Sequence, residues 1–287
     1  MSLIHPGVEA FVAVVRCSTV HGAAQELGLT QTAVTQRIRG LERRLETTLF
    51  TRSRRGMRLT PEGEALNRYC QSVIDLEGEL LSQLGAALGP ATLRLCIVGP
   101  SSMMRSRIIP AASAILADHE NVVFTFHLDD DLSGLPALKN GAAQLAVLPR
   151  AEVVNELDSK LLRPARYILV GPVAWSGREL RDVVRQERIV DFNEADDATH
   201  RYLERHRLLR HARRDRHLAN NTDALAALVA AGHGYSVLSE DFAQPLLAGG
   251  QLIDLNPGKH LRIDFALAWY PRHAMPAYFA SLIEEIQ

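Results

Sequence analysis

The feature of the sequence that most restricts its fold is a helical apolar stripe within residues 31–45. Four apolar residues recur at spacings of four, three and four, and they would form one buried face of an α-helix: Val34, Ile38, Leu41 and Leu45. Thr30 precedes the stripe and is suited to cap this helix at its N-terminus. Segments 8–15 and 21–27 also have helical spacing, and Gly28 can end the second of them. The pattern predicts three short helices around a shared core.

A short β-hairpin is predicted after the third helix. Between Leu49 and Thr60, apolar residues flank a glycine and three arginines: Arg52, Arg54, Arg55 and Gly56. Thr60 and Pro61 then suit the cap and first turn of a long helix that extends to about residue 88. Its apolar positions follow one another every three or four residues: Leu66, Tyr69, Val73, Leu76 or Leu80, Leu84 and Leu88. Because nothing else in this segment could cover that stripe, we expect the helix to pair with a second copy of the chain.

Beyond Pro90 the pattern changes to short apolar strands that alternate with helical stretches, which is typical of an α/β domain. We expect strands at 93–98, 122–128, 145–148, 167–170, 188–190, 235–238 and 263–269. Helices are expected within 102–116, 133–140, 176–187, 198–210, 222–231, 240–248 and 276–286. The chain thus divides into a small N-terminal module at 1–60, a linker helix at 61–89 and an α/β body at 91–287.

Charge is distributed unevenly along the chain, although the net charge is only -1. Residues 1–60 contain nine arginines and four glutamates, which gives +5, whereas residues 61–90 contain one arginine and five acidic residues, which gives -4. The 22 basic and 24 acidic residues that follow nearly cancel. We therefore expect only the N-terminal module to meet the phosphates of a nucleic acid.

The outer face of the 31–45 helix has the chemistry of a DNA-reading surface. At about 100° per residue, Thr32, Thr35, Gln36, Arg39 and Arg43 project away from Val34, and no acidic residue lies among them. Glutamine and arginine can bond base edges in pairs, and free N–H groups in the first turn can hold a phosphate. Taken alone, the stripe also fits an ordinary solvated helix face. The order of small-residue helix, glycine turn, third helix and arginine hairpin favours a winged helix-turn-helix instead.

Double-stranded promoter DNA is therefore the expected partner of residues 1–60. The candidate contacts lie on the third helix, at its cap and in the hairpin: Thr30, Gln31, Thr32, Thr35, Gln36, Arg39, Arg52, Arg54 and Arg55.

Several segments resemble the LysR-type transcriptional regulators. They are AAQEL at 23–27, TQTAVTQRI at 30–38, LE at 41–42, LFTR at 49–52 and LTPEG at 59–63. The resemblance implies that Gln31, Thr32, Thr35 and Arg52 contact DNA, with Thr35 at a position where serine is more common. It also implies a dimerising linker helix, assembly into a homodimer or homotetramer, and a small-molecule effector. RNA polymerase is a further candidate partner.

The resemblance further implies an α/β effector domain of two lobes, similar to periplasmic binding proteins. Lobe I would comprise about 91–167 and 245–287, and lobe II about 168–244. Ligands of such domains bind in the crevice at the carboxyl ends of strands. The loop at 99–102 follows the first strand of this domain, so its serines could bind a carboxylate or simply cap a helix. We expect the effector near the loops that end the strands: Ser101, Ser102, Asp129, Arg150, Phe192, Asn221 and Thr222.

Two of these effector candidates have an alternative interpretation. One of the three acids at 129–131 could hold an ammonium group, although a solvated turn is the plainer explanation. Arg150 could be a surface charge or a carboxylate clamp.

Segments 190–197 (VDFNEADD) and 247–258 (LAGGQLIDLNPG) resemble the lysine- and arginine-responsive regulators of amino-acid export. That resemblance implies a basic amino acid as effector and an exporter gene as target; another small carboxylate-bearing metabolite is the alternative.

Other classes of protein are disfavoured by the sequence. It contains no nucleophile elbow, no phosphate-binding loop and no dinucleotide turn, so we expect no enzyme, no catalytic residue and no cofactor. Neither a membrane span nor a signal peptide is apparent, which favours a cytoplasmic protein over a secreted solute-binding protein. The segment 200–217 holds four histidines and seven arginines, but the histidine spacings of six, five and six do not suit a helical metal site. We expect no bound metal and a solvated basic helix there.

Overall fold

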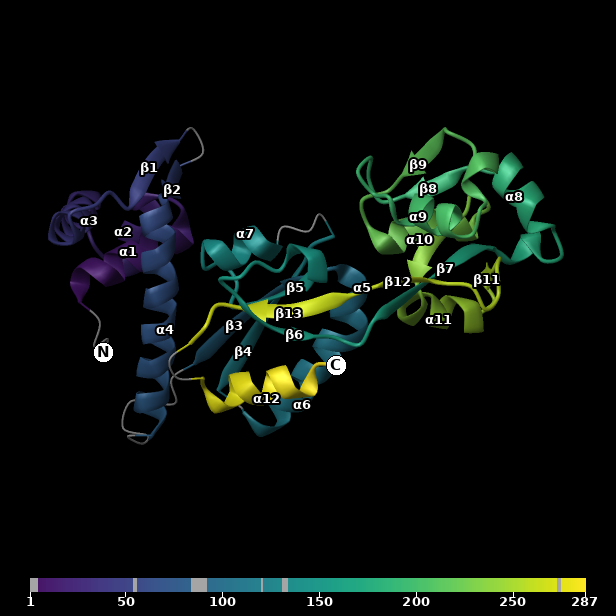
Figure 1. Cartoon of the computed structure of the whole chain (residues 1–287). Helices are drawn as coiled ribbons and strands as arrows, with labels where there is room; N and C mark the ends of the chain where they lie inside the picture. Colours follow the sequence, from purple (N-terminus) through teal and green to yellow (C-terminus); the bar gives the residue numbers. More distant parts are fainter. Residues whose placement is uncertain (1–4, 54–55, 84–91, 120, 131–133, 273–274) are drawn as a thin grey trace.

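The computed structural model describes residues 5–53, 56–83, 92–119, 121–130, 134–272 and 275–287. Its N-terminal module packs three helices around one core: α1 (Pro6–Cys17), α2 (Val20–Leu27) and α3 (Gln31–Leu45) (Figure 1). Within that core the rings of Phe11 and Phe50 lie 5.2 Å apart, against buried Val34, Ile38 and Leu41. The three expected helices are confirmed.

Leu45 departs from the expected stripe, because its side chain is 45% exposed. The helix ends at this residue, and Glu46 turns the chain in a left-handed conformation with φ 52°. The last turn of α3 has therefore passed beyond the core that Val34, Ile38 and Leu41 share.

The hairpin consists of β1 (Phe50–Ser53) and β2 (Gly56–Leu59), which pair antiparallel with Phe50 opposite Leu59. The end of the hairpin next to its turn docks on the segment between α1 and α2, where the N–H of Met57 donates to the carbonyl of Ser18 at 3.0 Å. Gly56 is required at this contact, since a Cβ atom there would lie 2.5 Å from the same carbonyl oxygen and the residue has φ 113°. The wing is thus fixed to the helices.

The linker helix α4 (Pro61–Gln83) begins at a cap that ties it to the wing. The hydroxyl of Thr60 accepts from the N–H of Gly63 at 3.0 Å and donates to the carbonyl of Thr48 at 2.7 Å. Farther along, Tyr69 and Leu76 are 65% and 47% exposed, as expected for an uncovered stripe. Leu84 and Leu88 lie outside the described residues, as does the side chain of Leu80. Pairing of this helix with a second copy remains a prediction.

Lobe I is built on a five-stranded sheet with the order β4-β3-β5-β13-β6. The strands are β3 (Leu93–Gly99), β4 (Val122–Leu128), β5 (Leu145–Pro149), β6 (Asp158–Leu161) and β13 (Phe265–Trp269). A continuous helical segment made of α5 (Ser101–Met103), the π-helical turn η1 (Met104–Ile108) and α6 (Ile109–Asp118) lies with α12 (Ala277–Glu285) on one face. The helix α7 (Gly134–Lys139) covers the other face (Figure 1).

Lobe II is organised around β7 (Ala165–Pro172), which pairs antiparallel with three strands: β10 (Ser236–Ser239), β11 (Leu252–Asp254) and β12 (Leu261–Ile263). A second pair, β8 (Ile189–Asp191) and β9 (Arg216–Leu218), runs parallel. The helices of this lobe are α8 (Leu180–Gln186), α9 (Ala198–Arg205), α10 (Thr222–Ala230) and α11 (Glu240–Ala248). Short 3-10 turns complete the chain: η2 (Arg150–Glu152), η3 (Val173–Trp175) and η4 (Leu209–His211).

The boundary between the lobes differs from the expected one. We expected 245–287 in lobe I, but β11 and β12 pair with β7 inside lobe II. The single strand expected at 263–269 is in fact two strands in different sheets. Ile263 pairs with Ala165 of lobe II, and Phe265 pairs with Pro149 of lobe I. The chain therefore returns to lobe I at Asp264.

The basic segment 200–217 is not one solvated helix. Only its first part belongs to α9, and it continues through η4 into β9. At the end of the segment, Arg216 donates at 2.8 Å to Asp191, a fully buried carboxylate. One of the seven arginines therefore has a structural role. Within the described residues, no group of three or more histidine, cysteine or acidic side chains is placed to hold a metal ion. None of the described helices is long and apolar enough to cross a membrane.

Candidate DNA interface and effector cleft

The outer face of α3 presents polar and basic side chains together. Gln31, Thr32, Gln36, Arg39 and Arg43 are exposed, whereas Thr35 is half-buried. On the opposite side the helix is held by the buried residues of the N-terminal core. Because that core fixes how the helix is rotated, the polar face projects away from the rest of the module and can enter a major groove.

Two of the candidate threonines already make bonds within the helix. The hydroxyl of Thr30 accepts from the N–H of Ala33 at 3.1 Å, so this residue caps α3. The hydroxyl of Thr35 donates to the carbonyl of Gln31 at 2.8 Å. Because this hydroxyl is already bonded, Thr35 would contact a base through its methyl group, which suits the methyl group of thymine.

No pattern in the sequence indicated a role for His21, which the fold brings beside the first residue of α3. The amide nitrogen of Gln31 lies 3.1 Å from Nδ1 of His21 at the start of α2. Of the wing arginines, Arg52 lies on β1 opposite Met57, while Arg54 and Arg55 fall outside the described residues. Arg58 is an exposed cation on β2 that the expected set did not include.

Side chains from both lobes meet at the junction between them, where the effector is expected. The N–H of Ser101 donates to Oδ1 of Asp130, and its hydroxyl donates to Oδ2, each at 2.6 Å. From lobe II, the hydroxyl oxygen of Thr222 lies 3.0 Å from that of Ser101 and 3.4 Å from Asp130. The structure thus brings Ser101 and Thr222 together, with Asp130 between them, and their contact with an effector stays a prediction.

A half-buried tyrosine completes this cluster. Tyr167 of β7 forms a side-chain hydrogen bond with Ser102, and burial raises its pKa to about 12. The carboxylates of Asp130 and Asp196 add to this effect. Tyr167 therefore stays protonated at neutral pH. Tyr167 belongs to the strand expected at 167–170. An apolar run does not show which of its residues face a ligand site and which face the core.

Four of the expected effector residues have other contacts in the structure, and their role toward an effector stays a prediction. Asp129 lines a hollow of about 370 Å³ on lobe I, beside Cys96 and His127. The side chain of Asn221 caps α10, accepting from the N–H of Ala224 at 2.9 Å. Phe192 packs against the lobe II core. Arg150 is exposed after β5, where its N–H donates to the carbonyl of Asp264 at 2.9 Å.

Two ion pairs connect the lobes beside this cluster. Arg107, whose side chain is only 7% exposed, donates to Asp241 of α11 through Nε at 3.1 Å and Nη2 at 2.8 Å. Two residues earlier, Arg105 donates to Asp223 of α10 at 2.9 Å, at an exposed position. Since both arginines lie on η1, one short segment of lobe I holds two helices of lobe II.

A winged helix-turn-helix joined through a long helix to a two-lobed α/β domain defines a DNA-binding regulator with a ligand-controlled domain. Comparison with known families agrees with this class. Residues 7–64 match the family described as "Bacterial regulatory helix-turn-helix protein, lysR family". Residues 89–287 match the "LysR substrate binding domain". The chain belongs to the LysR family of transcriptional regulators.

Curated relatives share this full-length organisation. The transcriptional regulator ArgP of Aeromonas salmonicida is 27% identical over 88% of this chain and 85% of its own length. PtxR of Pseudomonas aeruginosa is 29% identical over 97% of this chain and 90% of its own. Among solved structures, ArgP of Mycobacterium tuberculosis has a TM-score of 0.78 at 24% identity and covers 99% of this chain and 96% of its own. LysG of Corynebacterium glutamicum with bound effector Arg has a TM-score of 0.72 at 20% identity, with the same coverage.

Proposed function

We propose that this protein is a cytoplasmic regulator that binds promoter DNA as a homodimer or homotetramer and is controlled by a basic amino acid, lysine or arginine, in its cleft. An amino-acid exporter gene is the proposed target. The observation that carries the effector proposal is the position of Asp130, at the junction of Ser101 and Thr222. The names of the ArgP relatives and the arginine bound to LysG support the same class of ligand.

The contacts of Asp130 suggest how such an effector would enter. The N–H and hydroxyl of Ser101 are donors suited to the α-carboxylate of an amino acid, and Asp130 occupies both of them. When the effector carboxylate takes these donors, Asp130 is released toward a cationic group of the same ligand. The cleft would thus exchange an internal carboxylate for an external one while keeping its charge balanced.

We expect Asp130→Asn to weaken binding of lysine and arginine by about tenfold or more, because a neutral amide replaces a charge-assisted bond to ammonium. Isothermal titration of the full-length protein measures this change. Asp129→Asn is the matched control, since the neighbouring acid lines a different hollow, and its affinity for the effector should stay unchanged. Equal losses in both variants would contradict the assignment of Asp130.

The same titration distinguishes a basic amino acid from the alternative class of effector. If lysine and arginine give no heat while another small carboxylate-bearing metabolite does, the effector class proposed here is wrong and the regulator assignment stands. DNA binding is tested independently by gel shift and footprinting with the promoter adjacent to the gene, with and without effector. Sedimentation of the complex would give the dimer or tetramer, and transcription in vitro with RNA polymerase would give activation or repression.

A further inference from the structure

A histidine of α2 lies beside the start of α3. The side-chain amide nitrogen of Gln31, the first residue of α3, lies 3.1 Å from Nδ1 of His21. Both residues are exposed, so the contact is made at the surface of the N-terminal module. An amide nitrogen donates hydrogen bonds and does not accept them. Nδ1 is therefore the acceptor, and the imidazole of His21 is neutral with its proton on Nε2.

The backbone around this contact is fixed in both helices. The hydroxyl groups of Thr19 and Thr30 cap α2 and α3, each by accepting from the backbone N–H three residues later, at 3.0 and 3.1 Å. Between the helices, Gly28 ends α2 in a left-handed conformation with φ 64°. These features place the start of α2 beside the start of α3, so the helix-turn-helix itself holds residues 21 and 31 as neighbours.

The bond to His21 decides what the amide of Gln31 can offer to a base. A glutamine amide has two N–H donors and a carbonyl acceptor. His21 takes one N–H and thereby fixes which end of the amide is nitrogen and which is oxygen. One N–H and the carbonyl oxygen remain. This pair matches the N7 acceptor and the N6 donor of adenine, whereas guanine presents two acceptors, N7 and O6, at the same edge.

We propose that His21 is a positioning residue for base recognition, which orients the amide of Gln31 so that this side chain reads adenine in the major groove. The inference rests on the DNA binding proposed for α3, and it adds a residue from outside that helix. Without the bond to His21, the amide can rotate by half a turn and offer two N–H groups to guanine. Loss of His21 should therefore reduce discrimination between adenine and guanine more than it reduces affinity for DNA in general.

Fluorescence anisotropy with the full-length protein tests this proposal. The probes are the footprinted promoter site, the same site with each A·T pair replaced in turn by G·C, and unrelated DNA. At the base pair that Gln31 reads, we expect the replacement to weaken binding about tenfold, and Gln31→Ala should abolish this difference. His21→Ala should reduce the difference to about twofold, while the affinity for unrelated DNA changes by less than about twofold.

Conservative variants separate the two ring nitrogens of His21. Asparagine places its amide oxygen near the position of Nδ1, so His21→Asn keeps an acceptor for Gln31 and should restore most of the discrimination. His21→Gln places its amide near the position of Nε2 and should not restore it. Loss of a merely structural histidine would give no such difference. Gln25→Ala is the matched control, because Gln25 is exposed one turn farther along α2, and this variant should discriminate as the wild type does.

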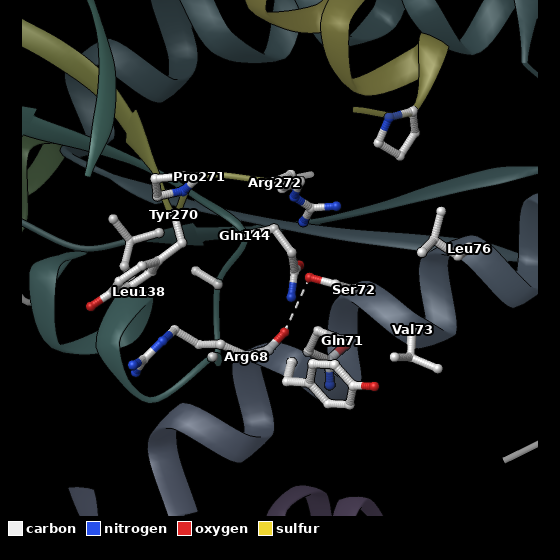
Figure 2. Close-up of a pocket in the computed structure, with 14 residues that line it drawn as sticks. Arg68, Gln71, Ser72, Val73, Leu76, Leu138, Gln144, Tyr270, Pro271 and Arg272 are labelled. Atoms are coloured by element: carbon white, nitrogen blue, oxygen red, sulfur yellow. Dashed lines mark hydrogen bonds between the residues drawn. The ribbon is translucent and has the colours of Figure 1, made fainter. Parts of the chain in front are cut away.

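The full-length chain is used because α4 connects the DNA-binding module to the rest of the protein. Arg68 of α4 stacks 4.3 Å from the ring centre of Tyr270 in lobe I, beside the hollow shown in Figure 2. Val73 and Leu76 line the same hollow and belong to the stripe that we expect to pair with a second copy. Both connections stay intact in the variants of α2 and α3, and thermal unfolding confirms that each variant is folded.

Three results would overturn the role of His21. If His21→Ala lowers specific and unspecific binding by the same factor, His21 holds a phosphate instead. If Gln31→Ala keeps the full discrimination at every base pair, Gln31 reads no base and His21 has nothing to orient. If Gln31→Ala abolishes the discrimination and His21→Ala does not, Gln31 reads its base unaided. The proposed function survives all three results, since it fails only if the wild-type protein does not prefer the promoter site to unrelated DNA, and the role of His21 would then fail with it.

Discussion

Gly63→Ala is expected to lower the free energy of unfolding of the DNA-binding module by about 3 kcal/mol. A Cβ atom at Gly63 would lie 2.2 Å from the carbonyl oxygen of Leu49, and that oxygen also accepts from the N–H of Thr60 at 3.0 Å. Adding one methyl group therefore forces α4 away from the chain that leads into the wing. Hydrogen exchange in urea measures the effect by region: amides of α1, α2 and α3 should lose protection, while those of the two lobes should not.

Gly40→Ala is the matched control for this prediction. Gly40 also lies within a helix, α3, but a Cβ atom there meets nothing within 4 Å outside the helix backbone. The same substitution should raise the free energy of unfolding by up to about 1 kcal/mol, because alanine has the higher helix propensity. If the two alanine variants changed stability alike, close approach of α4 to Leu49 would not be what this position requires.

The N-terminal module was the most predictable part of the molecule, because its signals are local. Apolar spacing, caps and turn glycines predict the bounds of α1, α2 and α3 to within a few residues of those in the structure. The rotation of α3 then follows from helix geometry alone. The short strands β6, β9 and β11 were not expected, since each has three or four residues and no buried apolar run.

The cleft was predictable only in part, because it depends on how loops turn after strands. The loop ends at Ser101 and Thr222 were identified, yet Asp130 rather than Asp129 reaches them. Adjacent residues in such a turn project in different directions, and composition does not tell which one enters the cleft. The exchange between lobes at Asp264 was hidden for a similar reason: residues 263–269 suggest a single strand in the sequence but belong to two sheets.

Contacts between distant segments were not predictable at all. Asn67 reads as an ordinary polar residue of a helix, and only the fold shows it buried against Asn140. His21 likewise becomes relevant only when α2 brings it beside Gln31. These residues make contacts between separate segments of the protein. What the sequence did not predict is therefore how these segments pack together, more than how each of them folds.

Arg39→Ala is expected to weaken binding to the specific promoter site by about 1–3 kcal/mol, roughly 5- to 150-fold. Arg39 is exposed on the face of α3 that carries Thr32 and Gln36, where a guanidinium can bond a guanine edge in pairs. Fluorescence anisotropy at several salt concentrations measures the affinity for the footprinted site and for unrelated DNA. Loss of a base contact should lower the first affinity far more than the second.

Arg44→Ala separates base reading from loss of charge. Arg44 is exposed on the same helix but lies off the polar face. The substitution therefore removes an equal charge and leaves the predicted base contact in place. Its variant should lower both affinities only slightly. If Arg39→Ala lowers specific and unspecific binding by the same factor and reduces the salt slope by about one, Arg39 holds a phosphate and reads no base. Unchanged affinity in that variant would remove Arg39 from the interface and shift base reading toward Gln36 and the first turn of α3.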